Sequence, residues 1–298
     1  MPSVTRLARS GGIPWQSDHA NWQANLTSAR LPIRRRGVGA AVTIHAMQPF
    51  AHLLGRFFRH LLPGACLLCE QALPATAELD LCAFCRPALP WNQHACPQCA
   101  QPRAPGSTES ACHHCLQRPP PFVRALAPLR YEGYVQPWIR RLKDNLGLVE
   151  GRLLGMLMAD AAAQAYQPRD GALGAGRRPD LLVPVPLAPA RLARRGHNQA
   201  LTLALPVARR LGIPVLRHAA ARRSGFGQQR GRSRAQRLEA TADLFVCRQR
   251  WQQPRPCIGI VDDVITTGTT ATALAQVLLA AGADEVHLIA AARTPRYR

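Results

Sequence analysis

The pattern of hydrophobic positions changes near residue 122. From there to the carboxyl terminus, short apolar runs typical of buried strands alternate with longer segments whose apolar residues recur every three or four positions, as in helices. The strand-like runs are Leu129–Glu132, Asp180–Pro186, Cys257–Val261 and Val286–Ala292. The helix-like segments are Val135–Leu142, Leu153–Ala165, Asn198–Leu211 and Thr270–Ala281, the last ended by Gly282. This alternation predicts an α/β domain in which helices flank a mostly parallel sheet.

The chain before residue 122 lacks this pattern. Residues 66–115 hold paired cysteines among Pro, Gln and Ala, with too few apolar residues for a conventional core. Pro119–Pro121 forms a stiff, non-helical joint, because each proline ring fixes φ and removes an amide donor. We therefore predict a small cysteine-rich module over residues 47–120 and a larger domain over residues 122–298.

Two kinds of segment are predicted to lie outside regular structure. Residues 1–46 show no sustained periodicity, whereas a helix-like run begins at Met47. We interpret residues 1–46 as a disordered extension or as the product of a mis-assigned translation start. The stretches 168–179 and 222–236 are rich in Gly and Arg, which predicts loops.

Eight of the ten cysteines form four Cys-x-x-Cys pairs, whereas Cys247 and Cys257 stand alone. Two such pairs can present four thiolates to one tetrahedral ion, and a site closed in this way is structural because no coordination position is left for substrate. Since the same spacing recurs in each half, we predict two Zn²⁺ sites, with cross-paired knuckles as the alternative. The first set is Cys66, Cys69, Cys82 and Cys85, and the second is Cys96, Cys99, Cys112 and Cys115. We interpret His113 and His114 as surface residues.

Composition narrows the classes of function. With 298 residues, 47% of them hydrophobic, and no run of 18 apolar residues, the chain is predicted to be a globular cytoplasmic protein without a transmembrane helix. Its formal net charge is +21, and the stretch Arg191–Arg255 is dense in Arg, with Glu239 and Asp243 as its acids. Such a stretch suits anionic ligands, including nucleic acid.

The most informative segment begins at the strand-like run from Cys257. Two adjacent acids, Asp262 and Asp263, are followed by a hydroxyl- and glycine-rich loop that enters a helix. Backbone amides at such a helix start bind phosphate, while carboxylates beside a phosphate are suited to sugar hydroxyls or Mg²⁺. The segment therefore predicts a ribose phosphate site, and it matches neither Gly-x-x-x-x-Gly-Lys-Ser/Thr nor Gly-x-Gly-x-x-Gly. The predicted ligand contacts are Val261, Val264, Ile265, Thr266, Thr267, Gly268, Thr269 and Thr270.

These residues carry a family resemblance. Val261–Thr270 resembles the loop of type I phosphoribosyltransferases that binds phosphoribosyl pyrophosphate (PRPP), and about residues 47–298 resemble the ComF/GntX family, which joins a double zinc ribbon to such a domain. The segments Tyr131-Glu-Gly and Leu142-Lys-Asp, Val183-Pro-Val-Pro, Arg195-Gly-His-Asn-Gln, and Gln229 with Ser233–Leu238 also resemble family motifs. This chain departs from those motifs at His197, Arg232 and Ala240, where Phe, Leu and Asn are usual.

The resemblance implies specific roles for several residues. It assigns catalysis to Asp262, Asp263, Lys143 and Arg195. Arg191 and Arg194 are added as predicted PRPP contacts because they follow the strand that ends at Pro186, where a bidentate donor can meet the pyrophosphate. Lys143 is the only lysine of the chain, which indicates that a compact ammonium is needed there. Arg237 is a weaker candidate, and the segment His197–Gln199 either contacts the ligand or caps and packs the helix that it begins.

We predict an enzyme that displaces pyrophosphate from C1 of PRPP, with Mg²⁺, by an acceptor that the sequence does not identify. The family's association with DNA uptake implies single-stranded DNA or the competence machinery as partner. The alternative is a non-catalytic module that senses PRPP or binds single-stranded nucleic acid. A metal-dependent redox protein has only the cysteines in its favour, and the oligomeric state stays open.

Overall fold

A computed structural model describes residues 64–107, 110–144, 147–167, 177–223 and 244–296. All of them belong to the second of two compact units, Ala41–Arg298. The predicted extension at residues 1–46 lies outside the described residues. So do most of the two predicted loops, together with Gln229, Arg232, Arg237 and Ala240.

The centre of the unit is a mostly parallel sheet, as predicted. Its strands follow the order β1-β7-β6-β3, every pair in this order is parallel, and β2 also pairs with β7 in parallel. The strands are β1 (Arg124–Leu126), β2 (Leu129–Arg130), β3 (Leu181–Pro184), β6 (Cys257–Ile265) and β7 (Glu285–Arg293). A separate antiparallel pair consists of β4 (Ala220–Arg222) and β5 (Phe245–Cys247).

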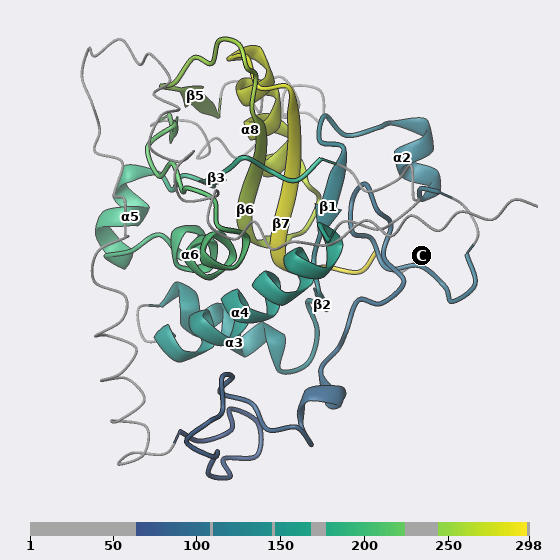
Figure 1. The fold of residues 1–298 in the computed structure, drawn as a ribbon, viewed down its shortest axis with the longest axis vertical. Coiled ribbons are helices and arrows are strands. Elements are labelled where there is room, and N and C mark those ends of the chain that lie inside the picture. The colour runs from purple at the N-terminus through teal and green to yellow at the C-terminus, as the bar shows by residue number, and fades with distance from the viewer. Residues whose placement is uncertain (1–63, 108–109, 145–146, 168–176, 224–243, 297–298) are drawn as a thin grey trace, which may run out of the picture. The chain divides into compact units, whose positions relative to one another are not determined.

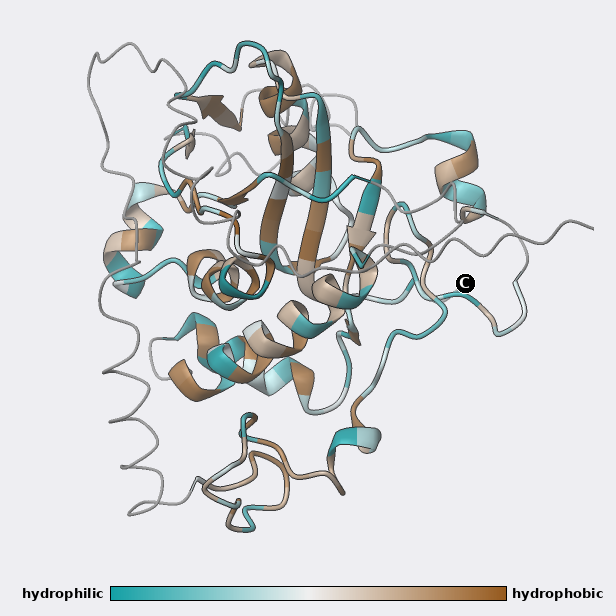
Figure 2. Ribbon diagram, in the orientation of Figure 1, coloured by the Kyte–Doolittle hydropathy of each residue, from teal (hydrophilic) through white to brown (hydrophobic). Residues whose placement is uncertain are grey.

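Helices cover both faces of this sheet (Figure 1). On one face, α3 (Val135–Lys143), α4 (Leu148–Ala165) and α6 (Gln199–Leu211) pack with Ile289 and Ala291. On the other, α8 (Thr269–Ala280) packs with Leu288 and Ala290. Alternate residues of β7 therefore belong to two different cores, and Figure 2 shows β6 and β7 hydrophobic over most of their length. No helix within the described ranges is both long enough and apolar enough to cross a lipid bilayer.

The structure extends several predicted elements. The strand predicted over Cys257–Val261 continues to Ile265, because β7 pairs with it along its whole length and supplies Arg293 as the partner of Ile265. The helix predicted from Leu153 begins earlier, at Leu148. The helix α5 (Pro189–Arg195) was not predicted, because its short apolar pattern is masked by arginines. These differences lengthen the scaffold without changing the predicted fold class.

The cysteine-rich segment has little regular structure and contains an internal repeat. Its helices are the short η1 (Arg86–Ala88) and α2 (His113–Gln117). Isolated bridges join Ala65 to Ala72 and Ala95 to Pro102, and the amides of Cys66 and Cys96 each donate to a carbonyl five residues ahead at 2.9 Å. The two halves thus repeat the same turn, which is the duplication that the cysteine spacing predicts.

Gly282 combines a left-handed backbone with a close contact to another part of the chain. Its φ is +105°, and a Cβ there would collide with the carbonyl of Trp251. Gly212 is a matched control, because its φ is +65° but nothing lies within 4 Å of the corresponding Cβ position.

We expect Gly282→Ala to lower the free energy of unfolding more than Gly212→Ala does. Each change costs about 1–2 kcal/mol for the left-handed backbone, and the collision adds about 1–3 kcal/mol at Gly282 alone. Urea unfolding of both variants measures the difference. Equal losses would show that the contact with Trp251 is not constraining.

Candidate functional site

The eight paired cysteines lie in two groups of four, with the pairing predicted from their spacing. Within each group the ligand atoms all lie within 4.8 Å of one another. The Sγ atoms of Cys69 and Cys82 are 3.7 Å apart, and those of Cys99 and Cys112 are 3.6 Å apart. These arrangements fit tetrahedral four-thiolate Zn²⁺ sites, and His113 and His114 are exposed, as predicted.

Backbone amides donate hydrogen bonds to sulfur atoms of both groups, which stabilises the thiolate form that binds metal. The amide of Cys82 donates to Cys66 Sγ at 3.4 Å, and the amide of Cys112 donates to Cys96 Sγ at 3.2 Å. The hydrogen bond from the Cys99 side chain outweighs burial and lowers the pKa of Cys96 to about 4. This direction favours the thiolate of Cys96, which is the form that binds zinc.

The predicted ribose phosphate loop lies at the carboxyl end of β6, where it lines a small pocket. The lining residues are Asp262, Val264, Ile265, Thr266, Gly268, Thr269, Thr270 and Ala271. Gly268 has φ +85° and is the N-cap of α8, so it turns the chain directly into a helix N-terminus. The hydroxyls of Thr267 and Thr269 are 2.8 Å apart beside it. Val261 lies beneath the loop and is fully buried in the core.

The structure brings Lys143 to the acid pair. Lys143 is the last residue of α3, and its Nζ lies 2.8 Å from Asp263 Oδ2. The Asp263 side chain is 8% exposed, and its Oδ1 accepts the amide of Val264 at 2.8 Å. Asp262 Oδ1 accepts the amide of Asp263 at 2.8 Å. Burial, reinforced by the neighbouring Asp263, raises the pKa of Asp262 well above its usual value.

Arginines from α5 and β4 lie near this acid pair. Arg191 and Arg194 on α5 are exposed, while Arg195 is partly buried and its Nη1 donates to Gln199 Oε1 at 3.2 Å. Burial lowers the pKa of Arg195, Arg191 lowers it further, and Asp263 opposes the shift. On β4, Arg222 has its pKa lowered by burial and by Arg191, against the attraction of Asp262. Sequence reasoning did not single out Arg222, because only folding brings β4 near the acids.

Hydrogen bonds hold the segment His197–Gln199, which follows α5. Asn198 is the N-cap of α6: its Oδ1 accepts the amide of Ala200 at 3.0 Å, and its Nδ2 donates to the carbonyl of Val185 at 3.1 Å. His197 Nε2 lies 2.8 Å from the carbonyl of Leu142, the neighbour of Lys143. These contacts favour the capping and packing interpretation of this segment.

Arg293 holds the loop from below, and sequence reasoning did not find it. It is 2% exposed at the end of β7, and its Nη1 donates to the carbonyl of Ile265 at 2.7 Å and to that of Thr266. Burial lowers its pKa, an effect opposed first by Cys99 of the second cysteine group. The exposed Arg296 adds a bond to the carbonyl of Thr267 at 3.1 Å. A buried Arg thus connects the loop with a thiol cluster.

Comparison of the sequence with known proteins identifies relatives of this chain. The family model of the double zinc ribbon domain matches residues 57–116, in agreement with the predicted module. The chain is 32% identical over 237 residues to "DNA utilization protein YhgH" of Escherichia coli strain K12, a match that covers 78% of this chain and 98% of that protein. It is 31% identical over 185 residues to "Competence protein F" of Haemophilus influenzae, covering 61% of this chain and 78% of that protein.

Two solved structures also match part of the chain. One is titled the allosteric regulatory enzyme of purine biosynthesis, with 19% identity, a TM-score of 0.31 and coverage of 51% of this chain and 26% of that one. The other is glutamine PRPP amidotransferase from B. subtilis, with 21% identity, a TM-score of 0.33 and coverage of 49% and 27%. This chain thus spans about a quarter of the length of those enzymes.

We expect Arg293→Met to destabilise the zinc-loaded protein more than Arg296→Met does. The first change removes both bonds of a buried guanidinium, each worth about 1.5–3 kcal/mol because the donor is charged, although the carbonyl of Ile265 keeps the amide of Thr294 at 3.0 Å. The second removes one exposed bond worth about 1 kcal/mol or less. Thermal and urea unfolding measure both. Similar losses in the two variants would contradict a supporting role for Arg293.

Proposed function

Since this chain belongs to the ComF family, we propose that residues 122–298 bind PRPP at the carboxyl end of β6 and transfer its phosphoribosyl group to an acceptor, releasing pyrophosphate. The observation that carries this proposal is the position of two adjacent acids, of which Asp263 is buried and Asp262 partly buried, and one lysine beside a glycine-containing helix start. An anion site alone would not place carboxylates there, whereas a sugar phosphate needs both kinds of group.

The loop would take the 5-phosphate. Amides of residues 266–270 and the positive end of α8 suit a phosphate monoester, and the threonine hydroxyls add donors. Gly268 leaves the approach open, because nothing lies within 4 Å of where its Cβ would be. Val264 and Ile265 would contribute backbone to the same pocket.

The acids would take the ribose. Asp262 lines the pocket, and the pKa of its carboxyl is raised because burial and Asp263 disfavour the ionised form. A bound hydroxyl donor or cation would stabilise that ionised form. Oxygen donors of this kind fit Mg²⁺, which would neutralise charge on the pyrophosphate when bound. Asp263 is already paired with Lys143, which would keep both groups ordered before ligand arrives.

The cations would serve the departing pyrophosphate. In the proposed reaction the bond from C1 to the pyrophosphate oxygen breaks, a bond from C1 to the acceptor nucleophile forms, and the nucleophile's proton passes to solvent. Arg195, with the exposed Arg191 and Arg194, lies where guanidinium groups can bind phosphate oxygens as charge develops on them. Lys143 would add a compact positive charge.

The names of the relatives suggest a setting for this activity. We propose a role in the use or uptake of DNA, with single-stranded DNA or the uptake machinery as partner. We also propose a cytoplasmic location, because thiols that bind zinc must stay reduced. The exposed arginines of α5 support a second candidate function, in which the protein binds single-stranded nucleic acid and does not catalyse phosphoribosyl transfer.

Calorimetric titration of the zinc-loaded full chain with PRPP and Mg²⁺ tests the first proposal. We expect saturable binding that Asp262→Asn weakens at least about tenfold, or about 1.4 kcal/mol, because an amide has no negative charge for the metal and offers one acceptor oxygen in place of two. Affinity should rise with pH as Asp262 ionises. Asp160→Asn is the control, since Asp160 is a half-exposed acid on α4 that lies 3.9 Å from its partner Arg86. Absence of binding by folded wild-type protein would overturn the proposal.

Fluorescence anisotropy with a labelled single-stranded oligonucleotide tests the second candidate. If α5 binds the phosphate backbone, Arg191→Ala with Arg194→Ala should weaken binding and flatten its dependence on log salt by about 0.7 for each phosphate that the protein no longer neutralises. Arg209→Ala with Arg210→Ala removes two exposed charges from the end of α6 as control. Equal effects of both sets of changes would indicate only a general attraction of the basic chain for polyanions.

A further inference from the structure

Three metal-binding side chains gather at the amino ends of β6 and β7, apart from the groups described above. They are Cys257, Glu285 and His287, and one ligand atom from each lies within 4.8 Å of the others. At about 3.3 Å per residue, Cys257 is about 16 Å along β6 from Asp262. Neither the zinc ribbons nor the ribose phosphate pocket uses these side chains.

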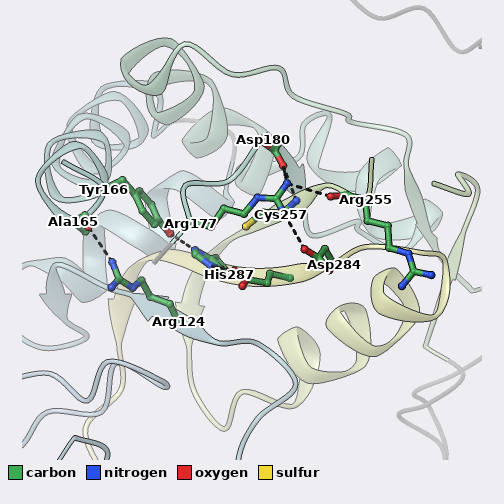
Figure 3. Close-up of polar contacts among 10 residues, drawn as sticks. Arg124, Ala165, Tyr166, Arg177, Asp180, Arg255, Cys257, Asp284 and His287 are labelled. Atoms are coloured by element: carbon green, nitrogen blue, oxygen red, sulfur yellow. Dashed lines mark hydrogen bonds and ion pairs between the residues drawn. The ribbon is translucent and has the colours of Figure 1, made fainter. Parts of the chain in front are cut away.

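The register of the sheet explains this gathering. Cys257 is paired with Glu285, and His287 is two residues further along β7, so all three side chains point to the same face. His287 is paired with Gly259, where the side chains of Leu182 and Pro179 fill the space that a Cβ would take. Figure 3 shows Cys257 and His287 on neighbouring strands, with Tyr166 next to the imidazole.

The imidazole is oriented as a metal ligand would be. His287 is fully buried, and its Nδ1 lies 2.7 Å from the Tyr166 hydroxyl, which holds the ring in place. Its Nε2 is buried without a hydrogen-bond partner among the described residues, and the nearest carboxylate oxygen, Glu285 Oε2, is 3.5 Å away. Two ligands on a tetrahedral Zn²⁺, with bonds of about 2.1 Å, are separated by about 3.4 Å. The observed separation is therefore poor for a hydrogen bond and right for a shared ion.

The charges nearby are compatible with a cation. Arg177 is paired with Asp180 at 2.9 Å and with Asp284 at 2.8 Å, so two carboxylates offset its charge. Asp180 Oδ2 also accepts the amide of Cys257 at 2.7 Å. Arg124 lies over the Tyr166 ring and donates to the carbonyl of Ala165 (Figure 3). The Glu285 side chain is 37% exposed, which provides a route for an ion from solvent.

We propose that Cys257, Glu285 and His287 bind one divalent transition-metal ion of the Zn²⁺ class. A thiol, an imidazole and a carboxylate form a borderline-soft donor set that suits Zn²⁺ and does not suit Mg²⁺ or Ca²⁺. Three protein ligands leave the fourth position for water, unlike the closed ribbon sites. Tyr166 is the second-sphere partner that fixes the imidazole, a role common at zinc sites.

Cadmium-113 NMR of the cadmium-loaded full chain tests this site. We expect two resonances typical of four-thiolate coordination and a third, clearly upfield, from one sulfur with nitrogen and oxygen ligands. Cys257→Ser should remove the third and keep the other two. Cys247→Ser is the matched control, since Cys247 is also a lone cysteine on a strand, and its Sγ donates to the carbonyls of Ala219 and Gln249.

Zinc content gives an independent measure. After saturation and dialysis, wild-type protein and Cys247→Ser should hold one more zinc per chain than Cys257→Ser and than His287→Gln. Two four-thiolate resonances alone in wild-type protein would overturn the proposal, and this result needs no variant to fold. Survival of the third resonance in folded Cys257→Ser would overturn it as well, because the ion would then be bound elsewhere.

Discussion

The pairing of β6 with β7 is the constraint on which both ends of the α/β domain depend. The two strands pair in one register from Cys257 with Glu285 to Ile265 with Arg293, and both are buried on two faces. Because side chains alternate along a strand, this register decides which residues share a face. At the carboxyl end it sets the acid pair above the loop that enters α8. At the amino end it gathers a thiol, a carboxylate and an imidazole. A slip of one residue would separate the thiol from the other two groups and move Arg293 away from the loop.

Buried charge at the carboxyl end requires partners, and the fold supplies them. Asp263 is paired with Lys143, while Arg293 turns its guanidinium toward backbone carbonyls of the loop. Each charge removed from water is costly unless such contacts compensate for it. The result is a set of dipoles and charges held in place around the loop. In the proposed transfer, this order would stabilise the charge that develops on the departing pyrophosphate.

The two cysteine groups replace a hydrophobic core, but they have different neighbours. The first packs with the apolar cluster of α3 and α4, through residues such as Leu73 and Leu81. The second is tied to β1, where the amide of Ala125 donates to the carbonyl of Pro97 at 2.9 Å, and it lies beside Arg293. Zinc binding would therefore stabilise two different parts of the domain, since the folding energy of such modules comes from the metal.

The sequence by itself determined the elements whose signals are local. Hydrophobic periodicity placed the central strands and the main helices, cysteine spacing placed both thiol groups, and the run from Asp262 to Thr270 marked the loop, because each depends on residues close together in the chain. Only the tertiary structure decided what meets across the chain. Arg222 approaches Asp262, Arg293 supports the loop and His287 joins Cys257 because strands far apart in sequence pair in a particular register, and no local pattern encodes that register.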